Sequence, residues 1–155
     1  MGKEIERKFL VIGDGYKPNS KLSYFKQGYL STNPQRTVRV RLNGNKGYIT
    51  VKGISNGAVR PEYEYEIPAE DAEEMLEGLC EKPLIEKYRY ECYFKGYNWE
   101  IDEFFGKNEG LVIAEIELSD EDECFEKPEW VGEEVTSDSR YFNSSLVNNP
   151  YCNWK

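Results

Sequence analysis

The 155-residue sequence contains no histidine, the side chain that most often serves as a base or a metal ligand at neutral pH. Any catalysis must therefore depend on carboxylates, lysine, tyrosine or a metal-bound water. No apolar run is long enough to cross a bilayer, and the N-terminal segment lacks the apolar core of a secretory signal. These absences predict a cytoplasmic protein without membrane contact.

Positive charge is also scarce, because 20 Lys and Arg residues face 29 Asp and Glu residues, a formal net charge of −9. This balance argues against nucleic acid or an anionic membrane as partner, but it allows an anionic ligand held by a local group of cations. The cysteines form no CxxC pair, so we expect reduced, structural thiols and not a zinc site. They are Cys80, Cys92, Cys124 and Cys152.

Apolar and polar residues alternate with the period of a β-strand through most of the chain. Turn sequences such as NGNKG at 43–47 and SNG at 55–57 separate the alternating segments, and neither a repeat nor a linker divides residues 1–155. Eight strands in antiparallel succession favour a closed sheet in a single domain. We expect them at 3–11, 22–31, 36–43, 47–53, 59–67, 84–95, 97–105 and 111–119.

Three helices are expected beside the strands. Apolar residues at helical spacing predict one at about 69–81. Ser119 as an N-cap predicts a short helix at about 119–126, before Pro128, and a third helix is expected at 140–147. The predicted fold is of the α+β class and mainly β: an eight-stranded antiparallel closed barrel with a few helices packed outside.

One face of each strand carries charge. In the first strand, EIERK, a strand conformation places Glu4, Glu6 and Lys8 on one face and Ile5 on the other. Acids dominate the first, fifth, seventh and eighth strands, and bases dominate the third, fourth and sixth. Solvated sheet faces are the alternative explanation, but the segregation of sign favours a charged lumen. The corresponding positions are Arg39, Arg41, Lys52, Arg60, Glu62, Glu64, Lys87, Arg89, Glu100, Asp102, Glu115 and Glu117.

Such a lumen suits a specific kind of ligand. Clustered Arg and Lys side chains attract a polyanion and present donors that match phosphate oxygens. Clustered carboxylates repel one another and bind a hard divalent cation such as Mg²⁺ or Mn²⁺. The two together predict a site for a metal–polyphosphate complex, since burying so many charges without a ligand is costly.

EIERK resembles the ExExK signature of the CYTH proteins, also called triphosphate tunnel metalloenzymes. Further motifs occur in the order of that family and span nearly the whole chain, in the manner of its short bacterial, stand-alone members. They are QGYL at 27–30, VRVR at 38–41, TVK at 50–52, RPEYEYEI at 60–67, EKYRY at 86–90, EIDEF at 100–104, AEIEL at 114–118 and GEEVTSDSRYFN at 132–143.

The resemblance implies an eight-stranded tunnel and assigns roles to residues of this chain. Glu4, Glu6, Glu115 and Glu117 would bind the metal, Glu62 and Glu64 would support it directly or through water, and Asp102 would join this acidic side. Lys8, Arg39, Arg41, Lys52, Lys87 and Arg89 would hold the phosphates, with Arg60 and Arg140 as further members. Lys8 and Tyr29 would form a proton-transfer pair if neighbouring cations lower the pKa of Lys8.

The implied activity is hydrolysis of tripolyphosphate to pyrophosphate and phosphate, with Mg²⁺ or Mn²⁺ activating the water that attacks the terminal phosphorus. Alternatives within the family are an adenylate cyclase and a thiamine or nucleoside triphosphatase; a polyphosphate-binding module without catalysis is another. The protein is expected as a monomer or homodimer. Phe142 departs from the family pattern, which tends to have a basic residue there. The outward tyrosines Tyr63, Tyr65, Tyr88 and Tyr90 are expected under helices, with a dimer contact as the alternative.

Overall fold

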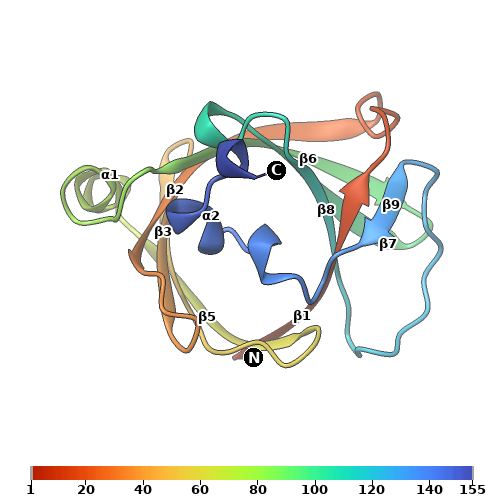
Figure 1. Cartoon of the computed structure of the whole chain (residues 1–155), viewed down its shortest axis with the longest axis horizontal. Helices are drawn as coiled ribbons and strands as arrows, with labels where there is room; N and C mark the ends of the chain where they lie inside the picture. The colour runs from red at the N-terminus through yellow and green to blue at the C-terminus, as the bar shows by residue number, and fades with distance from the viewer. Residues whose placement is uncertain (1, 155) are drawn as a thin grey trace.

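Nine strands form one antiparallel sheet within residues 2–154, the part of the chain that this computed structural model describes. Their order is β5-β4-β3-β2-β6-β7-β8-β1-β9, and a pairing of β5 with β1 closes the first eight of this series into a barrel (Figure 1). The predicted antiparallel barrel is confirmed. Its strands are β1 (Lys3–Val11), β2 (Ser20–Ser31), β3 (Thr37–Asn43), β4 (Lys46–Lys52), β5 (Val59–Ile67), β6 (Ile85–Phe94), β7 (Tyr97–Phe104) and β8 (Val112–Glu117).

The ninth strand, β9 (Val131–Glu134), was not predicted from the sequence. It pairs with the end of β1 at a register shift, and it places the Glu134 carboxylate on the guanidinium of Arg7, with N···O distances of 2.8 and 2.6 Å. Four residues are too few to show an alternating pattern, so tertiary pairing alone identifies this strand.

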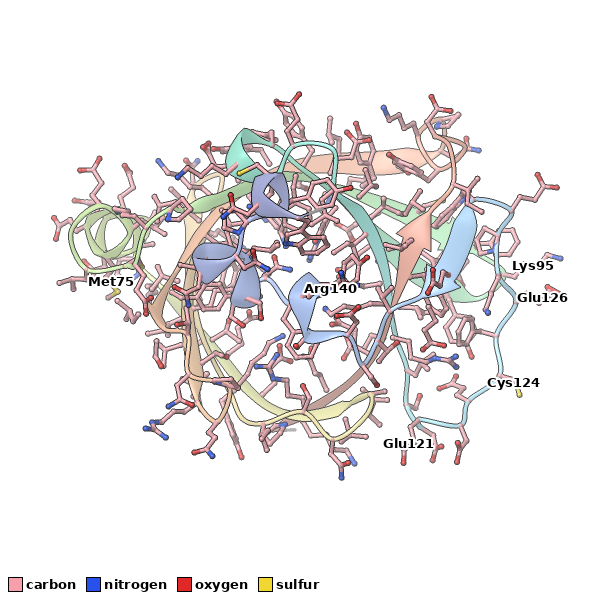
Figure 2. The ribbon with its side chains drawn as sticks, viewed as in Figure 1. Met75, Lys95, Glu121, Cys124, Glu126 and Arg140 are labelled. Carbon is pink, nitrogen blue, oxygen red and sulfur yellow. The ribbon has the colours of Figure 1, made fainter. Side chains whose placement is uncertain are left out.

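α1 (Ala69–Gly78) is the helix predicted at 69–81, and it ends at Gly78. Its buried residues Ala72 and Leu76 pack with Val40 of β3, so the helix covers the outside of the barrel, where Figure 2 shows Met75. No helix in the described residues is long and apolar enough to cross a membrane.

The helix predicted at 119–126 is wrong, because this segment forms turns and then an extended loop. The Glu123 carboxylate accepts hydrogen bonds from the backbone N–H of Ser119, at 2.7 Å, and from the hydroxyl of Tyr97. Phe125 packs its ring edge-on against aromatic rings of β1 and β7. Long-range aromatic packing therefore overrides the local N-cap signal.

The helix predicted at 140–147 is split. η2 (Ser139–Tyr141) and α2 (Ser145–Asn148) flank Phe142, whose backbone is extended. Of the two α-helices in residues 2–154, only α1 packs outside the barrel; α2 lies across the ring of strands in Figure 1, contrary to the expectation that all helices are external. The remaining short elements are η1 (Gly106–Asn108) and η3 (Tyr151–Asn153).

α2 closes one end of the barrel with an apolar plug. Leu146 and Val147 are buried against Tyr29, Ile85 and Phe104, which come from three barrel strands. Ile85 and Phe104 share the lumen-facing parity of Lys87 and Arg89 of β6 and of Glu100 and Asp102 of β7, so the lumen changes from charged to apolar toward α2.

The outer face of β1, β7 and β8 is covered by the loop before β9 and not by a helix. Phe9, Trp99 and Ile116 are buried there together with Trp130. The outward tyrosines of β5 and β6 are mostly uncovered, which corrects the expectation of helix cover: Tyr63, Tyr65 and Tyr88 are exposed, whereas Tyr90 packs edge-on against Tyr16.

Candidate active site

A cavity of about 180 Å³ lies inside the barrel, and every barrel strand contributes at least one polar side chain to its wall. The alternation of charge along each strand produces this wall, because alternate side chains enter the lumen. Most of the residues that were predicted for the site meet here. They are Glu4, Glu6, Lys8, Tyr29, Arg39, Arg41, Lys52, Arg60, Glu62, Glu64, Lys87, Arg89, Glu115 and Glu117.

Three carboxylates form the tightest acidic group of the described residues. One oxygen from each of Glu6, Glu100 and Glu115 lies within 4.8 Å of the others. Antiparallel register explains the convergence, since Glu100 faces Glu115 across β7 and β8, and Lys8 faces Glu115 across β1 and β8. Glu100 was not predicted as a ligand; the signal was the WEIDEF alternation, which places Glu100 on the same face as Asp102.

Burial gives these carboxyl groups different pKa values. Burial raises the pKa of Glu100 to about 7, against the opposing charge of Arg89 and with help from Glu115. Burial and the charge of Glu115 also raise the pKa of Glu6. For Glu115, burial alone would raise the pKa, but the charges of Lys8 and Arg89 outweigh it and lower the pKa to about 2. The cluster therefore combines one carboxylate with a lowered pKa, Glu115, with two carboxyl groups whose pKa is raised, Glu6 and Glu100.

Lys8 belongs to the acidic group. Its ammonium donates to Glu115 at 2.5 Å and to Glu6 at 3.3 Å. Burial would lower the pKa of Lys8, but the two carboxylates outweigh burial and raise it above its ordinary value. In this arrangement Lys8 is a fixed cation, which favours phosphate binding over the proton transfer considered from the sequence.

A second acidic group is formed by carboxylates from β1, β5 and β8. Glu4 accepts from Lys52 at 2.7 Å, and Glu62 lies 3.6 Å from the same ammonium. Glu64 accepts from Thr50 at 2.7 Å. Burial, together with Glu4 and Glu6, raises the pKa of Glu117, whose carboxylate lies at the end of β8. These carboxylates extend the acidic side of the cavity toward β5.

The opposite wall is basic. Arg41 is half-buried and donates to the amide oxygen of Gln27 at 3.1 Å, and it forms no ion pair to a carboxylate among the described residues. Burial and the charges of Arg39 and Arg89 lower the pKa of Arg41 to about 9. The Nε atom of Arg39 is buried without a hydrogen-bond partner within residues 2–154. Arg39 reaches one carboxylate, that of Glu64 at 3.2 Å, and Arg41 reaches none among the described residues, so an anionic ligand can supply the missing partners.

Asp102 lies among the bases and not in the carboxylate cluster, and it does not line the cavity. Its carboxylate accepts two hydrogen bonds from Arg89, at 2.8 and 2.9 Å, and one from Lys87 at 2.8 Å. Burial would raise the pKa of Asp102, but both cations outweigh it and lower the pKa. The residue therefore positions two bases of the basic wall. Burial lowers the pKa of Lys87 to about 7, although Asp102 opposes this.

Two other predicted residues are placed differently from the expectation. Tyr29 lines the cavity, but among the described residues the ammonium of Lys8 is hydrogen-bonded to Glu6 and Glu115, not to Tyr29. Arg140, labelled on the C-terminal segment in Figure 2, pairs with Asp138 at 2.7 Å and does not line the cavity. Asn143 lines the cavity and was not predicted; its side-chain oxygen accepts from Gln27 and Lys87.

The donor set fits a divalent metal. Only carboxylate oxygens converge at Glu6, Glu100 and Glu115, and hard cations such as Mg²⁺ and Mn²⁺ prefer oxygen ligands. The buried guanidinium groups face them across one cavity. Fold and site together define a closed barrel built to hold a polyphosphate with a divalent cation.

Comparison with known proteins agrees with this description of the fold and the site. Residues 2–151 match the CYTH domain, and the chain belongs to that family. It is 60% identical over 155 residues to an inorganic triphosphatase of Acetivibrio thermocellus, covering 100% of this chain and 99% of that protein. It is 39% identical over 151 residues to an inorganic triphosphatase of Nitrosomonas europaea, covering 93% and 96%. A solved structure of an inorganic triphosphatase superposes with a TM-score of 0.67 at 35% identity, covering 92% and 96%.

Proposed function

We propose that this protein is an inorganic triphosphatase, which hydrolyses tripolyphosphate to pyrophosphate and phosphate with a divalent cation. The observation that carries the proposal is the meeting of a carboxylate cluster and a buried guanidinium wall in one cavity of about 180 Å³. The full-length similarity to two proteins named inorganic triphosphatase supports it.

The acidic side would hold Mg²⁺ or Mn²⁺. Glu6, Glu100 and Glu115 are the central ligands in this proposal, with Glu4 and Glu117 beside them. A divalent cation supplies Lewis-acid stabilisation of phosphoryl oxygens and activation of water. The raised pKa values of Glu6 and Glu100 reflect crowded, buried carboxyl groups, and such crowding is relieved by a cation.

The basic wall would bind and orient the phosphates. Arg41 and Arg39 offer guanidinium donors that have no full complement of partners within the described residues. Arg89 and Lys87 are held in place by Asp102. Because these donors are fixed before substrate binds, they stabilise the negative charge on the transferred phosphoryl group and leaving group without reorganisation. The apolar plug under α2 excludes bulk water from that end of the site.

A substrate panel tests the proposal. The protein is incubated separately with tripolyphosphate and with ATP, each with Mg²⁺, with Mn²⁺ and with a chelator, and products are separated. We expect phosphate and pyrophosphate from tripolyphosphate with either metal and none with the chelator. Cyclic AMP as the main product from ATP would replace the proposal with an adenylate cyclase. Tight tripolyphosphate binding without any phosphate release would indicate a binding module.

A further inference from the structure

Asn143 is the one residue with a side-chain amide among the described residues that line the cavity inside the barrel. It belongs to the segment between η2 and α2, so the C-terminal part of the chain contributes it and not a barrel strand. It lies at the basic wall, since its side-chain oxygen is 2.9 Å from the ammonium of Lys87. An amide has an acceptor and a donor, so its role depends on which of the two faces the cavity.

Hydrogen bonds fix the orientation of this amide. A guanidinium can only donate, so the contact of Arg41 Nε with the Gln27 side chain, at 3.1 Å, is made to the amide oxygen of Gln27. The amide nitrogen of Gln27 then donates to the side-chain oxygen of Asn143 at 2.8 Å. The ammonium of Lys87, which also can only donate, contacts the same oxygen. Reversal of either amide would place two donors against each other.

The network that holds Asn143 is buried in the barrel wall. Gln27 and Lys87 come from the neighbouring strands β2 and β6, and their side chains are almost completely inaccessible to solvent. Lys87 is held in addition by Asp102 at 2.8 Å. Buried polar groups whose hydrogen bonds are made keep one arrangement. The amide of Asn143 therefore has its orientation before a ligand binds.

The side-chain nitrogen of Asn143 is the polar atom that remains available. Its oxygen is engaged by Gln27 and Lys87, whereas no described residue accepts a hydrogen bond from its nitrogen. The side chain nevertheless lines the cavity. An N–H donor beside Lys87 suits an anionic oxygen and cannot coordinate a metal ion.

We propose that Asn143 binds the polyphosphate through its side-chain nitrogen, which donates a hydrogen bond to a phosphoryl oxygen, and that Gln27 is the positioning residue that keeps this donor available to the cavity. The inference rests on the proposed function and adds an uncharged donor to the basic wall. Because Asn143 precedes α2, the substrate contacts the C-terminal segment as well as the strands.

Substitutions of Asn143 separate substrate binding from a structural role. Asn143→Asp keeps an oxygen for Gln27 and Lys87 but removes the N–H donor, so it should fold while its KM for tripolyphosphate rises about 10- to 100-fold, with a smaller change in kcat. Asn143→Ala removes donor and acceptor and should also lower the melting temperature. An unchanged KM in folded Asn143→Asp overturns the inference.

Asn148→Asp is the matched control, because it makes the same chemical change at an exposed position of α2 that does not line the cavity. This variant should keep the wild-type KM. An equal rise of KM in Asn148→Asp and Asn143→Asp would mean that added negative charge alone explains the effect, and would contradict a contact made by Asn143.

The side-chain amide signal of Asn143 reports the contact directly in the wild type. Nuclear magnetic resonance assigns this signal by through-bond correlation to its own backbone. With Mg²⁺ and a saturating imido analogue of tripolyphosphate that resists hydrolysis, an Asn143 amide proton should move downfield more than those of Gln27, which does not line the cavity. Mg²⁺ alone should leave it in place. A signal that stays in place with bound analogue refutes the contact, even if no Asn143 variant folds.

Gln27→Glu tests the positioning role. A carboxylate still accepts from Arg41 but cannot donate to Asn143, so the amide of Asn143 should reverse and lose its contact with Lys87. We expect the KM for tripolyphosphate to rise about tenfold without a drop in melting temperature, since Arg41 gains an anionic partner. An Asn143 signal that still moves downfield with the analogue in Gln27→Glu would overturn the role of Gln27.

Failure of the proposed function is seen separately. If titration calorimetry shows that the wild type binds the imido analogue but no phosphate is released from tripolyphosphate, the triphosphatase proposal is wrong, and the Asn143 signal still decides the contact. If hydrolysis is normal and the signal stays in place with bound analogue, only the inference is wrong. Absence of both hydrolysis and binding would refute both.

Discussion

At the scale of single residues, Glu100 shows how a site residue can be overlooked and then recovered. Its carboxylate completes the cluster with Glu6 and Glu115, and burial raises its pKa to about 7. The alternation of the WEIDEF segment predicts Asp102 as the metal-side acid of that strand and leaves Glu100 without a role. Only the cross-strand register, which places Glu100 opposite Glu115, separates the two roles.

Replacing Glu100 with Gln should weaken metal binding, because it removes one of three converging oxygen ligands. We expect the Mn²⁺ concentration that gives half-maximal activity to rise about 10- to 100-fold. Titrations of activity and of Mn²⁺ binding by calorimetry measure the effect. Glu66→Gln, an exposed carboxylate outside the cavity, is the control, and equal metal dependence of the two variants would refute the assignment.

Arg41 and Arg89 both belong to the basic wall of the cavity, yet their replacement should have opposite consequences for stability. Arg41 lacks an ion pair within the described residues, so Arg41→Met removes an uncompensated charge from a partly buried position. We expect the melting temperature to stay or rise while the KM for tripolyphosphate increases at least about tenfold. A clear drop in melting temperature would contradict the first part.

Arg89→Met should instead destabilise the protein, because the buried carboxylate of Asp102 loses two of its three charged hydrogen bonds and keeps only the one from Lys87. Removing one partner of a buried ion pair typically costs about 3–5 kcal/mol. Urea unfolding of the two variants side by side measures the contrast. Equal stabilities would show that Asp102 does not hold the wall in the way the hydrogen bonds indicate.

At the scale of elements, the strands were predictable and the connections were not. Period-two alternation identifies each barrel strand, since one face is charged and the other apolar. The segment 119–126 has a local helix signal, but its conformation is determined by packing against aromatic rings that are far away in the sequence. The same holds for β9 and for α2, whose positions are determined by pairing with β1 and by apolar contacts inside the barrel end.

The aromatic packing that overrides the helix signal can be measured with Phe125→Ala. Because the ring packs edge-on against the rings of Phe9 and Trp99, its loss should cost about 1–3 kcal/mol of unfolding free energy. Urea unfolding gives the value. Cys124→Ala, an exposed neighbour labelled in Figure 2, should change stability by less than about 0.5 kcal/mol. Similar losses in both variants would mean that the loop is held elsewhere.

At the scale of the whole molecule, a net charge of −9 and a polyanionic ligand are compatible because the charges are separated inside the barrel. Acidic and basic strands occupy different arcs of the closed sheet; the sign of each strand was predictable, whereas the strand order that groups them into arcs comes from the structure. The depth of the lumen was not, because the apolar plug is completed by Leu146 and Val147 of α2. Sequence alternation thus predicts the walls of the site, whereas chain closure determines its ends.

This separation predicts that cation and polyphosphate stabilise the fold jointly. A ligand that binds only the folded state at about 100 times its Kd adds about 2.7 kcal/mol. Mg²⁺ and an imido analogue of tripolyphosphate that resists hydrolysis should therefore raise the melting temperature more together than the sum of their separate effects, because the cation neutralises carboxylates that would repel the phosphates. Scanning calorimetry with each ligand, both, and both plus chelator measures the coupling. Glu6→Gln serves as the internal comparison, since this variant should lose most of the stabilisation by Mg²⁺ and keep part of the stabilisation by the analogue. Purely additive shifts of the melting temperature in the wild type would mean that cation and analogue bind independently, and would contradict a shared metal–polyphosphate complex.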